Sequence, residues 1–299
     1  MAGWLSTRTV FFSAAAVALA STAIVVVVRT ASHERLDPAR CPPGAVALGP
    51  RCCAEGQYLK DSSCVGRPQR CPPNLEPFEG DLEGCVPPER RVEYRGGSLD
   101  VRPVDWEAEG VGARREARVA PFAIDASEMT VHRWQPCVAS GACRSLAAKD
   151  PGTALEPGRP VTGVTPEEAM RACRFYGGRL PSGDEWVFAA AGTEARRFPW
   201  GQTGLVCRRA VFGLVAGPCA RGAVGPEIAG TRPDGATQEG VLDLVGNVAE
   251  WTVEPDGSFV TRGGSYASRV AADVKSWSVE RPRGASPTIG FRCAYDVAE

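Results

Sequence analysis

Cysteine is the residue type through which this chain could do the most chemistry. The sequence holds 12 cysteines but only two histidines, His33 and His132. No cysteine pair has the CxxC spacing of a zinc site, and with so little histidine the cysteines favour disulfides over metal. Disulfides in turn indicate an oxidising compartment. His132 is interpreted as a surface or packing residue.

The cysteines form two even sets. They are Cys41, Cys52, Cys53, Cys64, Cys71 and Cys85 in the N-terminal part, and Cys137, Cys143, Cys173, Cys207, Cys219 and Cys293 in the C-terminal part. In the first set many pairings are open, and we expect bridges Cys53–Cys64 and Cys71–Cys85. In the second set, proximity alone suggests Cys137–Cys143 and Cys207–Cys219.

Composition excludes one class of partner and predicts an irregular fold. Lys and Arg total 34 against 35 Asp and Glu, so no basic field is present to attract nucleic acid. The 34 glycines and 25 prolines indicate many turns and irregular segments rather than a helical bundle. The length is sufficient to bury a core.

The first thirty residues contain an uncharged run, Val10 to Val28, between Arg8 and Arg29. At about 1.5 Å per residue such a run nearly crosses a hydrocarbon core of about 30 Å. A cleaved signal peptide and an uncleaved anchor remain as alternatives. The Ile24–Val28 stretch favours the anchor, so residues 1–30 are predicted to tether a periplasmic or cell-surface protein. Cleavage would instead make it secreted.

The domain organisation follows from composition along the chain. Residues 31–86 are predicted to be a Cys-rich stalk, because they offer few apolar residues for a core and would need crosslinks. A binding module is the alternative for this segment. Residues 87–117 are interpreted as a linker that also forms the first edge of the next domain. Residues 118–299 are predicted to be globular.

Two helices can be placed by their capping signals. Thr165 to Glu168 is a capping box with proline at the first helical position, and Gly177 ends that helix. Ser182 repeats the signal with Glu185, and Gly192 ends the second helix. Only short strands are expected elsewhere.

Several motifs in order along about residues 118–297 resemble one family. They are Phe122–Val131, Pro160–Val164, Gly178-Arg-Leu-Pro-Ser-Gly-Asp-Glu-Trp186, Phe198-Pro-Trp-Gly201, Gly240–Thr252 with its Gly246-Asn-Val-Ala-Glu-Trp251 block, Arg262-Gly-Gly-Ser-Tyr266 and Ile289-Gly-Phe-Arg-Cys293. The chain resembles the formylglycine-generating enzyme, or sulfatase-modifying factor, superfamily. The resemblance implies an α+β fold, related to C-type lectins, with little regular secondary structure.

The resemblance also implies where chemistry should occur. The family's working enzyme binds copper through two cysteines just after the Arg-Gly-Gly-Ser motif, and thiolates suit copper(I). Here Tyr266 to Ile289 contains no cysteine, and Cys293 belongs to a motif that supplies half of a structural disulfide in the family. A second, iron-dependent branch needs a histidine cluster, which this chain lacks. Neither copper nor haem is expected, so the domain is predicted to be a pseudoenzyme.

Two further features are implied by the resemblance. The positions of Asp243, Gly246, Val248 and Glu250 ligate a structural calcium ion in the family, through two carboxylates and two backbone carbonyls. A metal-free turn is the alternative. The position of Cys173 pairs with that of Cys293, which would tie the first helix to the C-terminal strand.

Three functions are open for a domain that lacks the family's copper-binding cysteines. The first is non-catalytic binding or scaffolding, in which a groove presents Tyr266, Arg269, Trp277 and Arg281 to an unknown peptide, glycan or protein. Ordinary packing and surface charge are the alternative for these four residues. The second is a divergent sulfatase-modifying-factor-type enzyme, an oxidoreductase of unknown chemistry. The third is a purely structural envelope protein.

Overall fold

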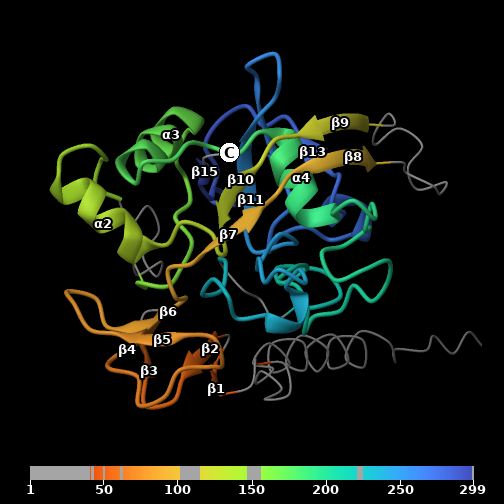
Figure 1. Ribbon diagram of the computed structural model, residues 1–299. Helices are drawn as coiled ribbons and strands as arrows, with labels where there is room; N and C mark the ends of the chain where they lie inside the picture. Colours follow the sequence, from red (N-terminus) through yellow and green to blue (C-terminus); the bar gives the residue numbers. More distant parts are fainter. Residues whose placement is uncertain are drawn as a thin grey trace, which may run out of the picture. The chain divides into compact units, whose positions relative to one another are not determined.

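The computed structural model describes residues 41, 44–49, 51–60, 63–101, 115–146, 156–220 and 225–297 (Figure 1). All of them belong to one unit, Leu36–Glu299. Within these ranges, every helix is too short or too polar to cross a bilayer. The predicted anchor, residues 1–30, lies outside the described residues.

The described residues contain three α-helices, and two of them start where their capping signals place them. In α3 (Pro166–Phe175), Thr165 Oγ1 accepts a hydrogen bond from the Glu168 amide, and Glu168 accepts one from the Thr165 amide. In α4 (Gly183–Ala191), Ser182 and Glu185 make the same reciprocal pair. Both predicted capping boxes are confirmed. The third helix, α2 (Val131–Ala139), has Thr130 at its N-cap without a side-chain cap hydrogen bond, and it contains Pro136.

The sheets are small, as the resemblance implies. One sheet has the order β15-β10-β7 and another β13-β12-β11-β14, with only the β11–β14 pair parallel. Their strands are β7 (Arg91–Tyr94), β10 (Phe122–Asp125), β11 (Ala249–Val253), β12 (Phe259–Arg262), β13 (Val279–Glu280), β14 (Ile289–Gly290) and β15 (Ala294–Asp296). Two 3-10 helices complete this part: η3 (Pro233–Gly235) and η4 (Ala271–Val274).

The segment expected to be a linker builds part of the domain. Within it, β7 pairs with β10, so that Glu93 faces Ala123. Next, β8 (Gly97–Val101) pairs with β9 (Arg115–Val119), and both strands contact α4. In β7 the side chains alternate between exposed and buried, with Val92 and Tyr94 inward. That alternation of period two is the pattern of a half-buried strand.

The Cys-rich segment forms three hairpins, and a disulfide between β2 and β4 joins the first hairpin to the second. The hairpins pair β1 (Ala45–Leu48) with β2 (Arg51–Ala54), β3 (Tyr58–Lys60) with β4 (Ser63–Val65), and β5 (Glu76–Phe78) with β6 (Gly84–Val86). Bridges join Cys41 to Cys52, Cys53 to Cys64 and Cys71 to Cys85. The last two are the pairs that we expected.

This segment is also joined to the domain by buried contacts, which a simple spacer would not need. The Glu156 carboxylate accepts hydrogen bonds from Arg51 Nη2 at 3.2 Å, the Cys64 amide at 2.8 Å and Arg159 Nε at 3.0 Å. All three charged side chains are buried. Because buried charges must be paired, this node holds the second hairpin against the domain.

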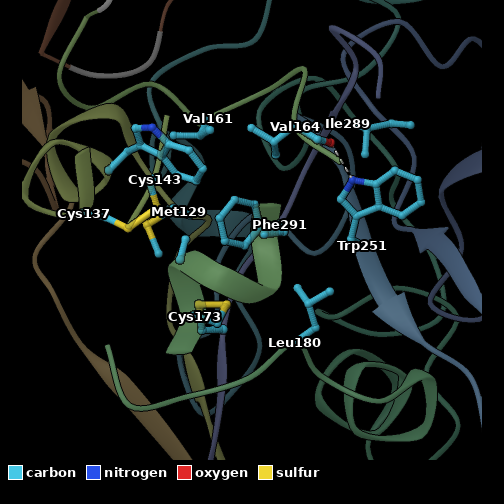
Figure 2. Close-up of a cluster of buried hydrophobic side chains, with 14 of the residues drawn as sticks. Met129, Cys137, Cys143, Val161, Val164, Cys173, Leu180, Trp251, Ile289 and Phe291 are labelled. Carbon is cyan, nitrogen blue, oxygen red and sulfur yellow. Dashed lines mark hydrogen bonds between the residues drawn. A yellow bond between two sulfur atoms is a disulfide. The ribbon is translucent and has the colours of Figure 1, made fainter. Parts of the chain in front are cut away.

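The largest core cluster lies between α2, α3 and the C-terminal strands (Figure 2). Trp134 meets Phe291 edge-on, and Trp251 donates its indole N–H to the Val164 carbonyl at 3.0 Å. Two disulfides lie in this core, Cys137–Cys143 and Cys173–Cys293. The second spans 120 residues and ties α3 to Cys293, directly before the C-terminal strand β15, as the resemblance implied.

Candidate functional site

The chain reverses sharply after β12, at the point where the family's metal-binding cysteines would follow. Gly263 and Gly264 have φ values of 84° and 66°, a region that favours glycine. A Cβ on Gly264 would lie 2.6 Å from Val274 Cγ1 and 2.8 Å from the Asp273 carbonyl oxygen. The two glycines therefore allow residues 266–274, here called the site turn, to fold back against the end of β12.

Polar side chains of the site turn are used to hold its own backbone. Ser268 Oγ accepts a hydrogen bond from the Ser265 amide at 3.0 Å, and Ser265 Oγ accepts one from the Ala267 amide at 3.2 Å. Asp273 Oδ2 accepts from the Arg269 amide at 3.4 Å. All 12 cysteines lie within the described residues, and every one is in a disulfide. The site turn therefore supplies no thiolate to a soft metal.

The four groove candidates do not come together as one surface. Tyr266 is buried in a cluster with Phe198 and Phe212, whereas Trp277 is buried in a different cluster around α4. Arg269 and Arg281 are exposed. The two aromatic residues are therefore core residues, and the two arginines are charged residues at the surface. The sequence could not separate these cases, because an aromatic residue in an irregular segment carries no periodic signal of burial.

A second irregular segment lies against the site turn. Residues 207–219 are closed by the Cys207–Cys219 bridge. The Gly213 amide donates to the Ser268 carbonyl at 2.7 Å, and the Leu214 amide donates to the Tyr266 carbonyl at 2.9 Å. These two bonds join the disulfide loop to the site turn along their backbones.

Three exposed valines lie on or directly beside these two joined segments in the sequence. Val206, Val215 and Val270 are 42%, 49% and 54% exposed, and they are three of the six exposed large hydrophobic residues in the described part of the chain. We call Val206, Val215, Val270 and the exposed Arg269 the valine surface. A contiguous exposed apolar patch would mark an interaction site, whereas singly exposed valines are ordinary.

A half-buried tryptophan, Trp200, packs against the cluster that contains Tyr266 and Phe212. Trp200 stacks on Phe198 with ring centroids 5.3 Å apart, and its indole N–H bonds the Thr203 carbonyl at 2.9 Å. The Arg209 guanidinium lies 5.7 Å from the Trp200 ring centroid. Sequence reasoning missed Trp200 as a site residue, although the Phe-Pro-Trp-Gly motif contains it.

The expected calcium ligands belong to a buried network of carboxylates. Glu250 Oε1 accepts from Arg292 Nη2 at 2.7 Å. Glu250 Oε2 accepts from Arg292 Nε at 2.7 Å and from Trp186 Nε1 at 2.8 Å. Asp243 has a φ of 55°, and its Oδ2 accepts from the Gly230 amide at 2.5 Å.

A third carboxylate, Glu128, was missed by sequence reasoning. It accepts hydrogen bonds from the loop between Asp243 and Glu250. Glu128 accepts from Asn247 Nδ2 at 2.7 Å and from the Val248 amide at 3.1 Å. Burial first, and then the charges of Asp243 and Glu250, raise the pKa of Glu128 well above its ordinary value. Burial raises the pKa of Asp243 to about 6. The raised pKa of Glu128 favours the protonated, uncharged form of this carboxyl group.

All the donors of this network are oxygen atoms, the ligand type that a hard divalent cation prefers. Glu250 has about one lone-pair direction left beside its three hydrogen bonds, and Asp243 has more. Among the described residues no three Asp, Glu, His or Cys side chains converge as a metal cluster. Backbone carbonyls such as those of Gly246 and Val248 would therefore have to complete the site.

Comparison with known proteins gives a consistent family match. The sequence model of the sulfatase-modifying factor enzyme 1-like domain matches residues 84–297. The inactive C-alpha-formylglycine-generating enzyme 2 of Mus musculus is 33% identical over 181 residues, 55% of this chain and 58% of that protein. The formylglycine-generating enzyme of Mycobacterium tuberculosis is 34% identical over 126 residues, 40% of each chain. The chain thus spans about half the length of these curated relatives.

Solved structures support the fold. The structure of PvdO from Pseudomonas aeruginosa matches with a TM-score of 0.57 and 19% identity, over 69% of this chain and 94% of that one. At that identity the likeness concerns the fold alone. The matched sequences include proteins named as active and a protein named as inactive.

Proposed function

The chain belongs to the family of sulfatase-modifying factor enzyme 1-like domains, and we propose that it is a non-catalytic member that binds a protein partner outside the cytoplasm. One observation carries the proposal: in the site turn, Ser268 and Asp273 bond backbone amides, and no cysteine of the chain is free. Copper-dependent oxidation of a thiol needs a thiolate ligand that this turn does not offer.

The partner is a protein or peptide segment with apolar residues and acidic flanks. The exposed side chains of Val206, Val215 and Val270 offer apolar area, while Arg269 offers positive charge. Apolar burial supplies affinity, and complementary charge supplies orientation and rate of encounter. A glycan is less suited to this surface, because valine side chains give its hydroxyl groups no hydrogen-bond partner.

Calcium has a structural role in this proposal. Asp243 and Glu250, with the carbonyls of Gly246 and Val248, would hold it beside Arg292. The ion would supply positive charge to a buried, acidic loop, and it would not take part in turnover. Extracellular calcium sites bind in the range of about 10⁻⁴–10⁻³ M, which suffices in an exported protein.

The location is part of the proposal. Residues 1–30 would tether the protein to a membrane, with the disulfide-bonded remainder outside the cytoplasm. Two observations support this: the uncharged run from Val10 to Val28, and six disulfides that need an oxidising compartment to form and persist.

Binding is tested with immobilised full-length protein and a library of apolar peptides flanked by Asp and Glu. We expect binders whose affinity falls by about tenfold or more in Val270→Asp, because the substitution removes apolar contact and repels the acidic flanks. Val46→Asp is the matched control, since Val46 has similar exposure but lies on β1. Equal losses in both variants, or no binder at all, would contradict a binding role for the valine surface.

Catalysis is tested separately. The oxidised full chain is incubated with copper(I), oxygen and a cysteine-containing peptide, and the peptide is analysed by mass spectrometry. We expect the cysteine to remain unconverted, whereas an aldehyde product would overturn the non-catalytic assignment and favour a divergent oxidoreductase. A copper-loaded formylglycine-generating enzyme serves as the positive control.

A further inference from the structure

One of the twelve cysteines differs from the others in exposure. Cys207 is exposed, whereas the remaining cysteines are buried or half-buried, and all twelve are described. Its partner Cys219 is buried. The Cys207–Cys219 bridge therefore joins an exposed cysteine to a buried one.

Exposure matters because disulfide exchange is a direct displacement. An attacking thiolate must approach one sulfur along the sulfur–sulfur axis, so the rate depends on which sulfur can be reached. The bridges Cys53–Cys64, Cys137–Cys143 and Cys173–Cys293 have both residues buried. Cys41–Cys52 and Cys71–Cys85 have only half-buried or buried residues.

The loop is built so that opening this bridge is a local event. Residues 210–214 are anchored independently: Ala210, Val211, Phe212 and Leu214 are buried, and the Asn247 amide donates to the Val211 carbonyl at 2.7 Å. Together with the two bonds to the site turn, these contacts persist without the disulfide. The exposed residues 215–218 would be released, whereas hydrogen bonds from the Arg209 and Ala210 amides to the Val206 carbonyl would hold the other end.

We propose that the Cys207–Cys219 disulfide is a thiol-exchange site for small thiols. The thiolate of the small thiol attacks Sγ of Cys207 and forms a mixed disulfide with it. The original sulfur–sulfur bond breaks, and its electron pair leaves on Sγ of Cys219, which takes a proton from water. A second small thiol then releases Cys207, so that the protein gains two thiols while two small thiols become one disulfide.

This exchange would act on the valine surface. Val206 directly precedes Cys207, and Val215 lies in the exposed part of the same loop. Opening the bridge would release Val215, while Val206, whose carbonyl accepts from the Arg209 and Ala210 amides, and Val270, in the site turn, would keep their places. The exposed apolar side chains of the valine surface would then be arranged differently in the reduced and oxidised states.

The test uses the folded full chain and reduced glutathione as the probe. Samples are quenched with acid at intervals, alkylated with N-ethylmaleimide and mapped by mass spectrometry. We expect glutathione on Cys207 and the alkyl group on Cys219, at a rate about tenfold higher than at any other bridge. Earlier reaction of Cys41–Cys52 or Cys71–Cys85, or glutathione carried by Cys219 instead of Cys207, would overturn the proposal.

Two controls keep the outcome decisive. The double variant Cys207→Ala, Cys219→Ala should lose the fast reaction and leave the other five bridges at their original rates. If that variant fails to fold, the wild-type chain in concentrated urea replaces it, because unfolding exposes all bridges and should abolish the preference. An unchanged order of reaction in urea would mean that the fold does not select this bridge. The readout involves no partner, so it is independent of the binding experiment.

Discussion

The guanidinium of Arg292 lies flat against the carboxylate of Glu250, with Nε and Nη2 each 2.7 Å from one carboxylate oxygen, and both residues are buried. Arg292 also donates to the carbonyls of Asp125 and Leu242. One side chain thus links β11, β10 and the loop before the Gly246 turn. The pair connects the sheets that carry the carboxylate network.

Glu250 and Arg292 should be energetically coupled. Glu250→Gln removes the carboxylate that pairs directly with the buried Arg292 guanidinium, and we expect a loss of about 3–5 kcal/mol in the free energy of unfolding. The double variant Glu250→Gln, Arg292→Met should lose less than the sum of the two single losses. Denaturant unfolding under oxidising conditions measures all three. Strictly additive losses would show that the two side chains are not coupled.

Calcium should stabilise the folded protein. Because a ligand that binds only the native state raises stability with its concentration, added calcium should raise the melting temperature and a chelator should lower it. Asp243→Ala should lose this response, whereas Asp256→Ala, at an exposed turn, should keep it. If neither calcium nor the chelator changes the melting temperature of the wild-type protein, calcium has no part in the proposed function.

His132 should make the folded protein sensitive to mild acid. Its ring lies 5.1 Å from Phe78, and burial lowers the pKa of His132 from 6.5, although the neighbouring Glu89 opposes the shift. The stability that depends on the neutral ring is therefore present above pH 6.5, and it is lost as pH falls through the lowered pKa.

His132→Asn should flatten this part of the profile. The free energy of unfolding is measured from pH 8 down to pH 5 for both proteins (about the range in which histidine changes charge). We expect the wild-type curve to fall more steeply than the variant curve below pH 6.5. Parallel curves would show that another group causes the acid sensitivity.

Glu156 should control how firmly the N-terminal hairpins are held. Glu156→Gln removes the counter-charge of the buried Arg51 and Arg159, so we expect faster amide hydrogen exchange at Cys64 and along β2. Glu79→Gln is the control, because Glu79 pairs with Arg67 at the surface, where such pairs contribute about 0–1 kcal/mol. Equal exchange in both variants would contradict docking through Glu156.

Gly264→Ala should disturb the site turn through both strain and contact. A φ of 66° costs an alanine about 1–2 kcal/mol, and its Cβ would also lie 2.6 Å from Val274 Cγ1. Gly141→Ala separates the two effects, since Gly141 has a φ of 78° with no atom within 4 Å of an added Cβ. Thermal unfolding should show the larger loss for Gly264→Ala. Equal losses would mean that Val274 moves away without cost.

Local signals in the sequence determined several parts of this protein. The capping boxes at Thr165 and Ser182 placed α3 and α4, because a cap is a bond between residues three positions apart. The even cysteine sets indicated disulfides, and the ordered motifs indicated the family, since neither depends on knowing which distant residues meet. The missing cysteines between Tyr266 and Ile289 could likewise be read directly.

Only the tertiary structure decided the pairings between distant segments. Glu156 meets Arg51 across 105 residues, and Glu128 meets Asn247 across 119, so no spacing in the sequence announces either contact. The same holds for the burial of Tyr266 and Trp277 in separate clusters. Burial in an irregular segment depends on what packs against it rather than on its own periodicity. For that reason the sequence could identify the motifs around the site. Which of its side chains are exposed, and which charged groups are paired, could be learned only from the tertiary structure.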